Sequence, residues 1–165
     1  MKYCLILACC FILLSCNTRQ SIPLFTLVEN TGITFVNKVT DGEIENSFYF
    51  RNYYNGGGVA LGDINNDGLP EVLFTSNMDD NKLYLNKGNC KFEDISVKSG
   101  LRQDSMWSTG ATFIDINNDG WLDFYICNSG HMQSGKRQNK LYINNHRLGF
   151  TEEASKYGLD FKAYA

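Results

Sequence analysis

Two nine-residue stretches hold the side chains of this chain that are best suited to chemistry. Residues 63–71 read DINNDGLPE and residues 115–123 read DINNDGWLD. In both, positions 1, 3, 5 and 9 carry oxygen-bearing side chains and position 6 is glycine. Calcium takes about six to eight oxygen ligands at roughly 2.3–2.6 Å, which a short loop supplies through alternate side chains and a sharp turn. The pattern therefore predicts two calcium-binding loops.

The predicted ligands have the same arrangement in both loops, with a backbone carbonyl at position 7. The first set is Asp63, Asn65, Asp67, the Leu69 carbonyl and Glu71, and the second is Asp115, Asn117, Asp119, the Trp121 carbonyl and Asp123. An alternative interpretation is that each stretch is an ordinary turn, because Asp, Asn and Gly dominate turns for reasons unrelated to metal. Two copies in equivalent contexts favour calcium.

The residues after each loop indicate which kind of calcium loop this is. An EF-hand needs a carboxylate at position 12 and a helix behind it. Position 12 is Phe74 in the first copy and Ile126 in the second, and neither side chain can bind a metal. The segments 71–77 and 123–129 are instead apolar, β-branched and aromatic, which predicts strands. Each loop should therefore join two strands, and a small calcium sensor is disfavoured.

Similarity between the two copies extends well beyond the loops. The matching pairs are residues 58–63 with 110–115, 82–86 with 140–144, Phe92 with Phe150, and 99–101 with 157–159. Each unit offers four short strands within a period of about 50 residues, which is the signature of a β-propeller blade. We therefore predict an all-β fold of about two four-stranded antiparallel blades, an incomplete propeller. The apolar residues expected to face neighbouring blades are Val59, Leu61, Leu83, Leu85, Phe113, Phe124 and Ile126.

The start of the chain predicts processing. Met1 and Lys2 precede an apolar run over residues 3–14, which is too short to span a bilayer. The run ends in LLSC and resembles a bacterial lipoprotein signal with its lipobox, which implies acylation of Cys16. The alternatives are an ordinary secretory signal or a start residue that was assigned wrongly. The resulting location is the cell envelope, lipid-anchored at the outer membrane or the cell surface, with no other membrane contact.

The expected organisation follows from the signal, the repeat and the loops. It is a signal peptide at 1–15, a tether at 16–24, a lead-in strand and hairpin or loop at 25–55, one blade at 56–101, a second at 102–159, and the start of a truncated third blade at 160–165. Tyrosines 49, 53 and 54 in the lead-in could form a ligand-facing patch, although packing is the favoured role for aromatic residues. The triple glycine at 56–58 is expected to let chain segments approach closely or turn between blades.

Several functions are disfavoured by composition and motifs. The net charge of −3 and the absence of a basic stripe argue against nucleic-acid binding. There is no Gly-x-Ser-x-Gly elbow, and the triple glycine precedes a predicted strand rather than opening a helix, so neither a hydrolase nor a dinucleotide site is indicated. We expect no catalytic residue. Beyond the signal and Cys16, only Cys90 and Cys127 remain, and their non-equivalent places in the two units argue against a disulfide.

On these residues, the two units resemble FG-GAP or VCBS-type repeats, the calcium-bearing propeller blades known from integrin α-subunits. The Phe-x-x-Val and Gly-Ile lead-in over residues 25–33, the triple glycine and the DINNDG loops also resemble secreted bacterial proteins that combine such repeats with an ASPIC/UnbV segment. Glu71 stands where the family has aspartate. The resemblance covers essentially all residues from 25 onwards, and it implies a calcium-stabilised propeller, usually seven-bladed, that serves binding or adhesion at the cell exterior.

The expected function is therefore a non-enzymatic segment of a bacterial surface lipoprotein that binds two Ca²⁺ ions and serves protein or glycan binding. An alternative is a non-catalytic part of a larger polysaccharide-active enzyme or uptake accessory protein. The chain stops just before a third loop would begin, which suggests a truncated product.

Overall fold

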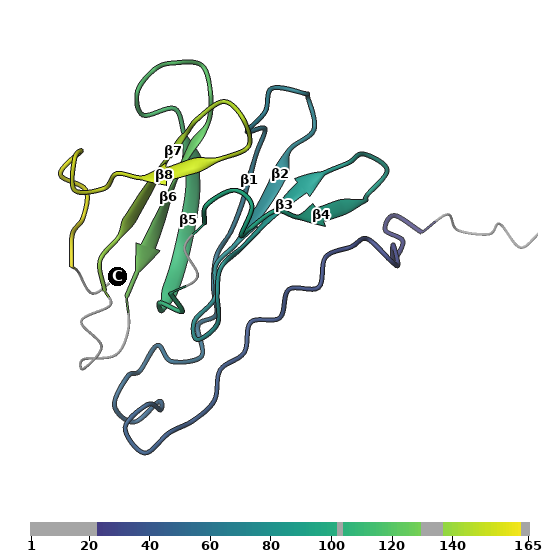
Figure 1. Ribbon diagram of the computed structural model, residues 1–165. Helices are drawn as coiled ribbons and strands as arrows, with labels where there is room; N and C mark the ends of the chain where they lie inside the picture. The colour runs from purple at the N-terminus through teal and green to yellow at the C-terminus, as the bar shows by residue number, and fades with distance from the viewer. Residues whose placement is uncertain (1–22, 102–103, 130–136, 163–165) are drawn as a thin grey trace, which may run out of the picture.

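The computed structural model describes residues 23–101, 104–129 and 137–162, and within them the chain is all-β (Figure 1). The first sheet contains β1 (Val59–Gly62), β2 (Glu71–Phe74), β3 (Lys82–Asn86) and β4 (Phe92–Asp94). The second contains β5 (Ser108–Ile114), β6 (Asp123–Asn128), β7 (Lys140–Asn144) and β8 (Phe150–Glu152). Each sheet is an antiparallel meander with its four strands in sequence order. The prediction of two four-stranded, propeller-like blades is confirmed.

The strand register sorts the side chains onto two faces of each sheet. In the first sheet Leu73 lies opposite Ala60 on β1 and opposite Leu83 on β3, so these three residues share one face. In the second sheet Phe124 lies opposite Phe113 and Tyr142. These two faces pack against each other, so each sheet buries an apolar face that it could not bury alone.

The core between the sheets is built on aromatic contacts around Phe124, which is fully buried. Its ring stacks on Tyr142 with centroids 4.7 Å apart and also meets the rings of Phe113 and Phe150. Full burial of each such side chain stabilises the fold by about 1.5–3 kcal/mol. The residues expected between blades and found in or against this core are Leu83, Leu85, Phe113, Phe124 and Ile126.

Val59 and Leu61 were also expected between blades, but they are 58% and 65% exposed. The register of β1 turns Ala60 and Gly62 toward the second sheet and leaves the two larger residues on the opposite face. Close approach of the two sheets explains why small residues occupy the face of β1 that is turned toward the second sheet. A Cβ on Gly58 would lie 2.7 Å from the Cα of Gly110, so the two sheets approach too closely there for a side chain. The close-approach role expected for the triple glycine is therefore present.

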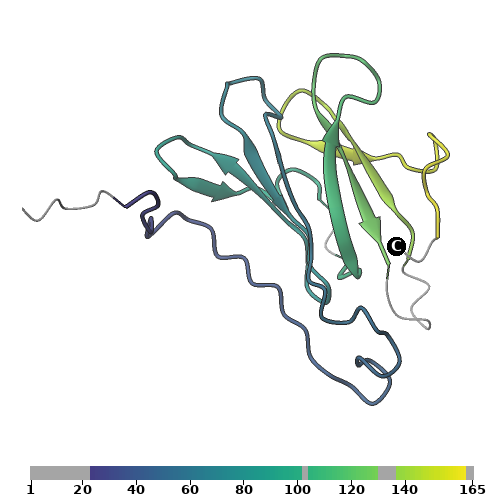
Figure 2. The same cartoon turned by 180° about the vertical axis from the view of Figure 1, so that it is seen from behind.

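The segment before the first sheet differs from expectation, because residues 23–58 form no strand. Figures 1 and 2 show an extended stretch running alongside the first sheet toward a loop at the far end. Its polar contacts go largely to side chains rather than to a neighbouring ladder. The N–H of Thr34 donates to the Tyr84 hydroxyl at 3.3 Å, and the Asn37 amide donates to Asn77 at 2.7 Å.

This extended stretch covers part of the first sheet's outer face, the one turned away from the second sheet. Phe35 stacks on Phe74 of β2 with ring centroids 4.8 Å apart and an interplanar angle of 14°. Tyr84 lies on the same face and is fully buried. The lead-in therefore takes the place that another sheet would occupy against this face.

A glycine turn occurs three times and links the lead-in to the repeats. The copies are Thr31-Gly32-Ile33, Ser99-Gly100-Leu101 and Tyr157-Gly158-Leu159, and their glycines have φ values of 89°, 82° and 67°. In the first two copies, the carbonyl before the glycine accepts the N–H of a strand-opening phenylalanine. Phe92 donates to Thr31 at 2.8 Å and Phe150 donates to Ser99 at 2.7 Å. The lead-in thus contacts the first sheet as the first sheet contacts the second.

Replacing Gly100 by alanine should destabilise the protein by about 2–4 kcal/mol. An alanine at this position would have to adopt the left-handed φ of Gly100, which is unfavourable by about 1–2 kcal/mol. Its Cβ would also lie 2.8 Å from the Phe150 carbonyl oxygen, which is too close for an unstrained contact. Gly158 has a similar φ but nothing within 4 Å of the same position, so Gly158→Ala should lose only about 1–2 kcal/mol. Urea unfolding of both variants measures the difference. Equal losses would show that the close approach contributes nothing.

Candidate metal centre

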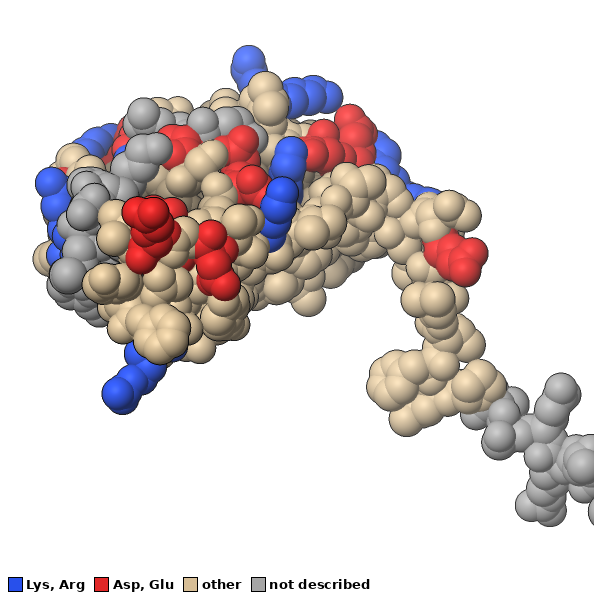
Figure 3. Space-filling view, turned by 90° about the horizontal axis from the view of Figure 1, so that it is seen from below, with Lys and Arg blue, Asp and Glu red and all other residues tan. Residues whose placement is uncertain are grey.

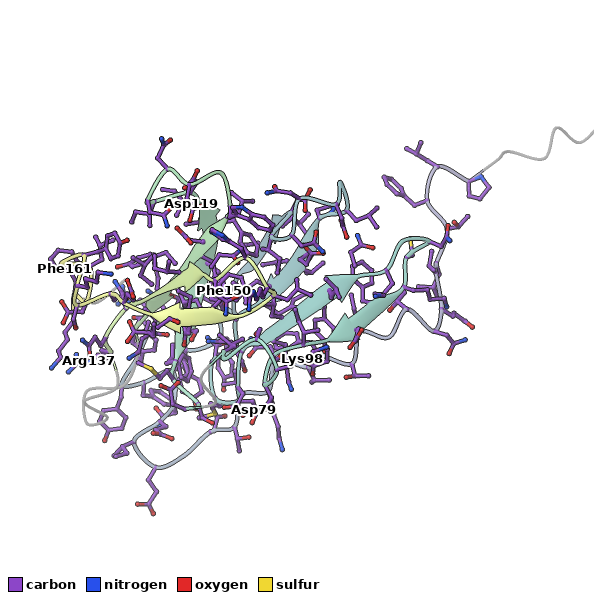
Figure 4. All side chains as sticks on the ribbon, turned by 45° about the horizontal axis from the view of Figure 1, so that its top comes forward. Asp79, Lys98, Asp119, Arg137, Phe150 and Phe161 are labelled. Atoms are coloured by element: carbon purple, nitrogen blue, oxygen red, sulfur yellow. The ribbon has the colours of Figure 1, made fainter. Side chains whose placement is uncertain are left out.

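The two acidic loops lie side by side at one end of the paired sheets. The first connects β1 to β2 and the second connects β5 to β6, and Figure 4 marks Asp119 on the second. The loops also touch, because the side-chain amide of Asn66 donates to the Gly120 carbonyl at 3.2 Å. The tandem sequence thus brings two separate acidic stretches together at one end of the molecule.

Each loop is held in shape by its own side chains. In the first loop, the two carboxylate oxygens of Asp63 accept the N–H groups of Asp67 and Gly68 at 3.1 and 2.8 Å. Asn65 accepts the same Asp67 N–H at 3.0 Å, so the oxygens at positions 1 and 3 lie on the same side of the loop. The corresponding contacts of the second loop, from Asp115 and Asn117, differ by 0.1 Å at most.

The sharp turn predicted at position 6 is present in both loops. Gly68 and Gly120 both have φ of 84°. The preceding position 4 also has a left-handed backbone, with φ of 59° at Asn66 and 58° at Asn118. Asparagine tolerates this conformation better than most residues, because its short polar side chain bonds locally. The sequence pattern did not indicate this second constraint.

The carboxylates at position 9 are buried rather than open to solvent. Glu71 accepts the N–H of Ile64 at 2.9 Å and the N–H of Asn86 at 3.3 Å. Asp123 does the same for Ile116 and Asn144, at 3.2 and 2.8 Å. Each carboxylate therefore ties its loop to the end of the third strand of its own sheet.

The asparagines at the ends of β3 and β7 complete this network, and sequence reasoning assigned them no role. Asn86 donates its side-chain amide to the Pro70 carbonyl at 2.9 Å. Asn144 donates to the Leu122 carbonyl at 3.0 Å and also to the Ile64 carbonyl of the first loop at 2.8 Å. The second sheet thus fixes the first loop directly. The only sequence signal was that both copies of the third strand end in Asn.

The electrostatics of the buried carboxylates oppose their ionisation. Burial raises the pKa of Glu71, the N–H groups of Ile64 and Asn86 counteract this, and the charges of Asp67 and Asp63 raise the pKa further. Burial likewise raises the pKa of Asp123, with Asp119 and Asp115 adding to the effect. A bound cation would favour the ionised form of every one of these groups.

The second loop has an additional partner that the first lacks. His146, in the turn between β7 and β8, places Nε2 2.9 Å from the Asp119 carboxylate and stacks its ring on Trp121 at 4.9 Å. The hydrogen bond with His146 lowers the pKa of Asp119. In the repeat alignment the first unit has Gly88 at this position. The two loops are therefore chemically similar but not identical.

The donor set of each loop suits a hard cation. All side-chain donors are carboxylate or amide oxygens, and the lysine ion pairs of the described residues, Lys82–Asp94, Lys140–Glu152 and Lys156–Glu153, lie elsewhere. Among the residues that the structure describes, no group of three His, Cys, Asp or Glu side chains is close enough together to hold a metal ion without rearrangement. The residues fit calcium in donor chemistry and charge, and the side chains would have to draw in around the ion.

Other residues singled out in the sequence lie apart from the loops. Cys16 falls outside the described residues. Cys90 is an exposed free thiol and Cys127 is a half-buried free thiol in this structure. Burial raises the pKa of Cys127, as for a packed rather than a reactive thiol. None of the described residues forms a helix long and apolar enough to cross a membrane.

Comparison with known families supports the interpretation of the repeat. Residues 63–126 match the sequence model of the family described as "FG-GAP-like repeat". The match begins at the first residue of the first loop and ends in β6, so it spans both loops. The chain carries an FG-GAP-type repeat. Repeats of this type are typically structural or binding modules, and the resemblance to the FG-GAP family is confirmed. The more specific resemblance to ASPIC/UnbV-associated proteins stays a prediction.

A curated protein also shares sequence with this chain. Cartilage acidic protein 1 of Xenopus tropicalis is 32% identical over 78 residues. The aligned stretch covers 47% of this chain and 12% of that protein, so it corresponds to a small part of the longer protein.

Replacing the position 9 carboxylates by amides should destabilise the protein even in the presence of a chelator. In Glu71→Gln, an NH₂ group would face either the Ile64 or the Asn86 N–H, which leaves a buried donor unsatisfied at about 1–3 kcal/mol. Asp123→Asn should behave alike. Glu93→Gln, on exposed β4, is the matched control and should change little. A chelated Glu71→Gln variant with wild-type stability would contradict the bridging role.

Proposed function

We propose that this FG-GAP-type chain is a non-enzymatic, calcium-stabilised repeat segment that presents a binding surface for a protein or a glycan outside the cell. The supporting observation is the pair of acidic loops that their own hydrogen bonds hold in the same shape. Each loop has three carboxylates and, among the described residues, no ion pair with a lysine or an arginine. The proposed ligands are the side chains at positions 1, 3, 5 and 9 and the carbonyl at position 7 of each loop. Attachment through an acylated Cys16 is part of the same proposal.

Calcium would act on structure rather than on a reaction. Its proposed ligands include Glu71 and Asp123, which already connect the loops to β3 and β7. A bound ion would cancel the repulsion within each carboxylate cluster and fix the loop to its sheet. With one amide among four side-chain ligands and an extracellular setting, we expect dissociation constants of about 10⁻⁴–10⁻³ M.

Terbium luminescence tests this proposal at the second loop. Tb³⁺ prefers the same hard oxygen ligands as calcium, and Trp121 at position 7 would sensitise its emission. We expect emission on tryptophan excitation, displacement by calcium, and a large loss of emission in Asp119→Asn. The exposed Asp79→Asn is the matched control and should keep the signal. Equilibrium dialysis should find two calcium ions per chain, and emission that survives Asp119→Asn would contradict the assignment.

A further inference from the structure

A cavity of about 230 Å³ lies at the end of the sheets opposite the acidic loops. Its lining residues are Phe50, Asn52, Asn55, Gly56, Trp107 and Thr109. Gly56 precedes β1 and Trp107 precedes β5, whereas the acidic loops follow these two strands. The cavity is therefore formed where the lead-in loop, at the lower end of Figure 1, meets the start of the second sheet.

One side of the cavity is a supported aromatic wall. Trp107 packs on Tyr53 with ring centroids 5.0 Å apart and meets the edge of Phe50 at 6.0 Å. Tyr53 is 2% exposed, and its hydroxyl donates to the Thr40 carbonyl at 2.6 Å. The buried Tyr53 therefore supports the Trp107 ring, and Trp107 in turn contacts Phe50. Both Trp107 and Phe50 remain half-exposed. Rigid, partly exposed aromatic rings are well suited to contact the apolar face of a ligand.

The other described residues that line the cavity carry no charge, and three of them have polar side chains, Asn52, Asn55 and Thr109. Asn52 and Asn55 are exposed, and their side-chain amides make no hydrogen bond to any described residue. Each amide offers two donors and one acceptor. The Thr109 hydroxyl donates to the Cys127 carbonyl at 3.3 Å, so its oxygen can still accept a hydrogen bond. Figure 3, which looks onto this end of the molecule, shows Asp and Glu side chains among a larger number of residues that are neither acidic nor basic.

Size and chemistry together define the ligand. The volume is below the roughly 300–1,000 Å³ of pockets for drug-sized molecules, so it suits a ligand portion of one ring. None of the described residues that line the cavity is a cation that could pair with a phosphate or a carboxylate. A purely apolar ligand would leave both amides without partners as it displaced their water, which is unfavourable.

We propose that this cavity binds one unit of a neutral saccharide, with the ring face on Trp107 and ring hydroxyls bonded to Asn52 and Asn55. The inference deepens the proposed binding function and rests on it. Of the three lead-in tyrosines expected to pack, Tyr53 does so, whereas Tyr49 and Tyr54 are 66% and 61% exposed. In this proposal Phe50 of the lead-in and Trp107 before β5 present a surface to the ligand.

The test uses the full chain with calcium present and a panel of neutral oligosaccharides of glucose, xylose, mannose and N-acetylglucosamine. Tryptophan emission and calorimetry are recorded up to about 10 mM, where a ligand with a millimolar dissociation constant is about 90% bound. We expect saturable binding of at least one oligosaccharide. Asn52→Ala/Asn55→Ala should weaken it at least about tenfold, since two hydrogen bonds are lost. Asn89→Gly, in the β3–β4 turn where φ is 52°, is the matched control and should bind normally.

Each other outcome overturns the proposal. Binding to no member of the panel would exclude a neutral saccharide at this site. Binding that persists in Asn52→Ala/Asn55→Ala would place the ligand elsewhere, and binding only of uronic acid polymers or peptides would assign another ligand class. Calcium-dependent stabilisation is measured on the same samples. A chain that shows the calcium effect without saccharide binding overturns this inference alone, and a chain that shows neither also overturns the calcium role.

Discussion

Calcium is expected to raise the thermal unfolding midpoint of this chain by about 10 °C over its value in chelator. At ten times the dissociation constant, each site stabilises the folded state by about 1.4 kcal/mol, and the two sites together by about 2.8 kcal/mol. For a fold of this size, 1 kcal/mol corresponds to a shift of about 3–4 °C. Circular dichroism melts with calcium, magnesium and chelator measure the effect. Magnesium should act weakly, because it prefers an octahedral, largely hydrated site.

Variants at position 5 separate calcium binding from the structural role of the loops. Asp67 is exposed and makes its contacts within the loop, with the Leu69 N–H and the Asn65 amide. Asp67→Asn keeps an acceptor for the Leu69 N–H and removes one of three clustered charges. In chelator the variant should therefore be as stable as the wild type or slightly more so, whereas in calcium it should lose about half of the shift. A calcium shift of wild-type size in Asp67→Asn would contradict a site in the first loop.

The strands and loops were predictable because their determinants are local in sequence. Alternation of apolar residues decides which face of a strand is buried, and Asp, Asn and Gly at fixed spacing decide where the chain turns. Gly68 is an example, since its φ of 84° follows from a turn that the nine-residue pattern already required. The comparison of two copies added information that a single copy would not contain, because it identified the strands that accompany each loop.

Contacts between distant segments account for what the sequence did not predict. His146 reaches Asp119 from 27 residues away, and Asn144 bonds the Ile64 carbonyl from 80 residues away. Such partners depend on how the two sheets pack, and no local pattern encodes that packing. The lead-in was predicted only in part for the same reason. Its expected strand is absent, whereas alternation around Phe48 suggested a hairpin or a long loop, and the backbone there forms turns with nearby aromatic residues packed on Trp107.

The lead-in is expected to be a structural part of the first sheet, so Phe35→Ala should destabilise the protein by about 2–4 kcal/mol. The ring of Phe35 stacks on Phe74, beside the fully buried Tyr84. A buried Phe→Ala change removes about 3–5 kcal/mol, and the half-buried state of Phe35 reduces this figure. The urea midpoint measures the loss, and the neighbouring Val36→Ala is the matched control because Val36 is 72% exposed.

The strands in which Phe35→Ala increases amide hydrogen exchange distinguish a lead-in that supports the first sheet from one that is loosely attached. If the segment replaces a missing neighbour of the first sheet, Phe35→Ala should increase amide hydrogen exchange in β2 and β3 before it affects β6 and β7. Hydrogen exchange in the second sheet should change less, because the substitution leaves the core between the two sheets unchanged. Equal stability of Phe35→Ala and Val36→Ala would show that the segment rests on the sheet without supporting it. The outer face of β2 and β3 would then need another cover to account for the burial of Tyr84.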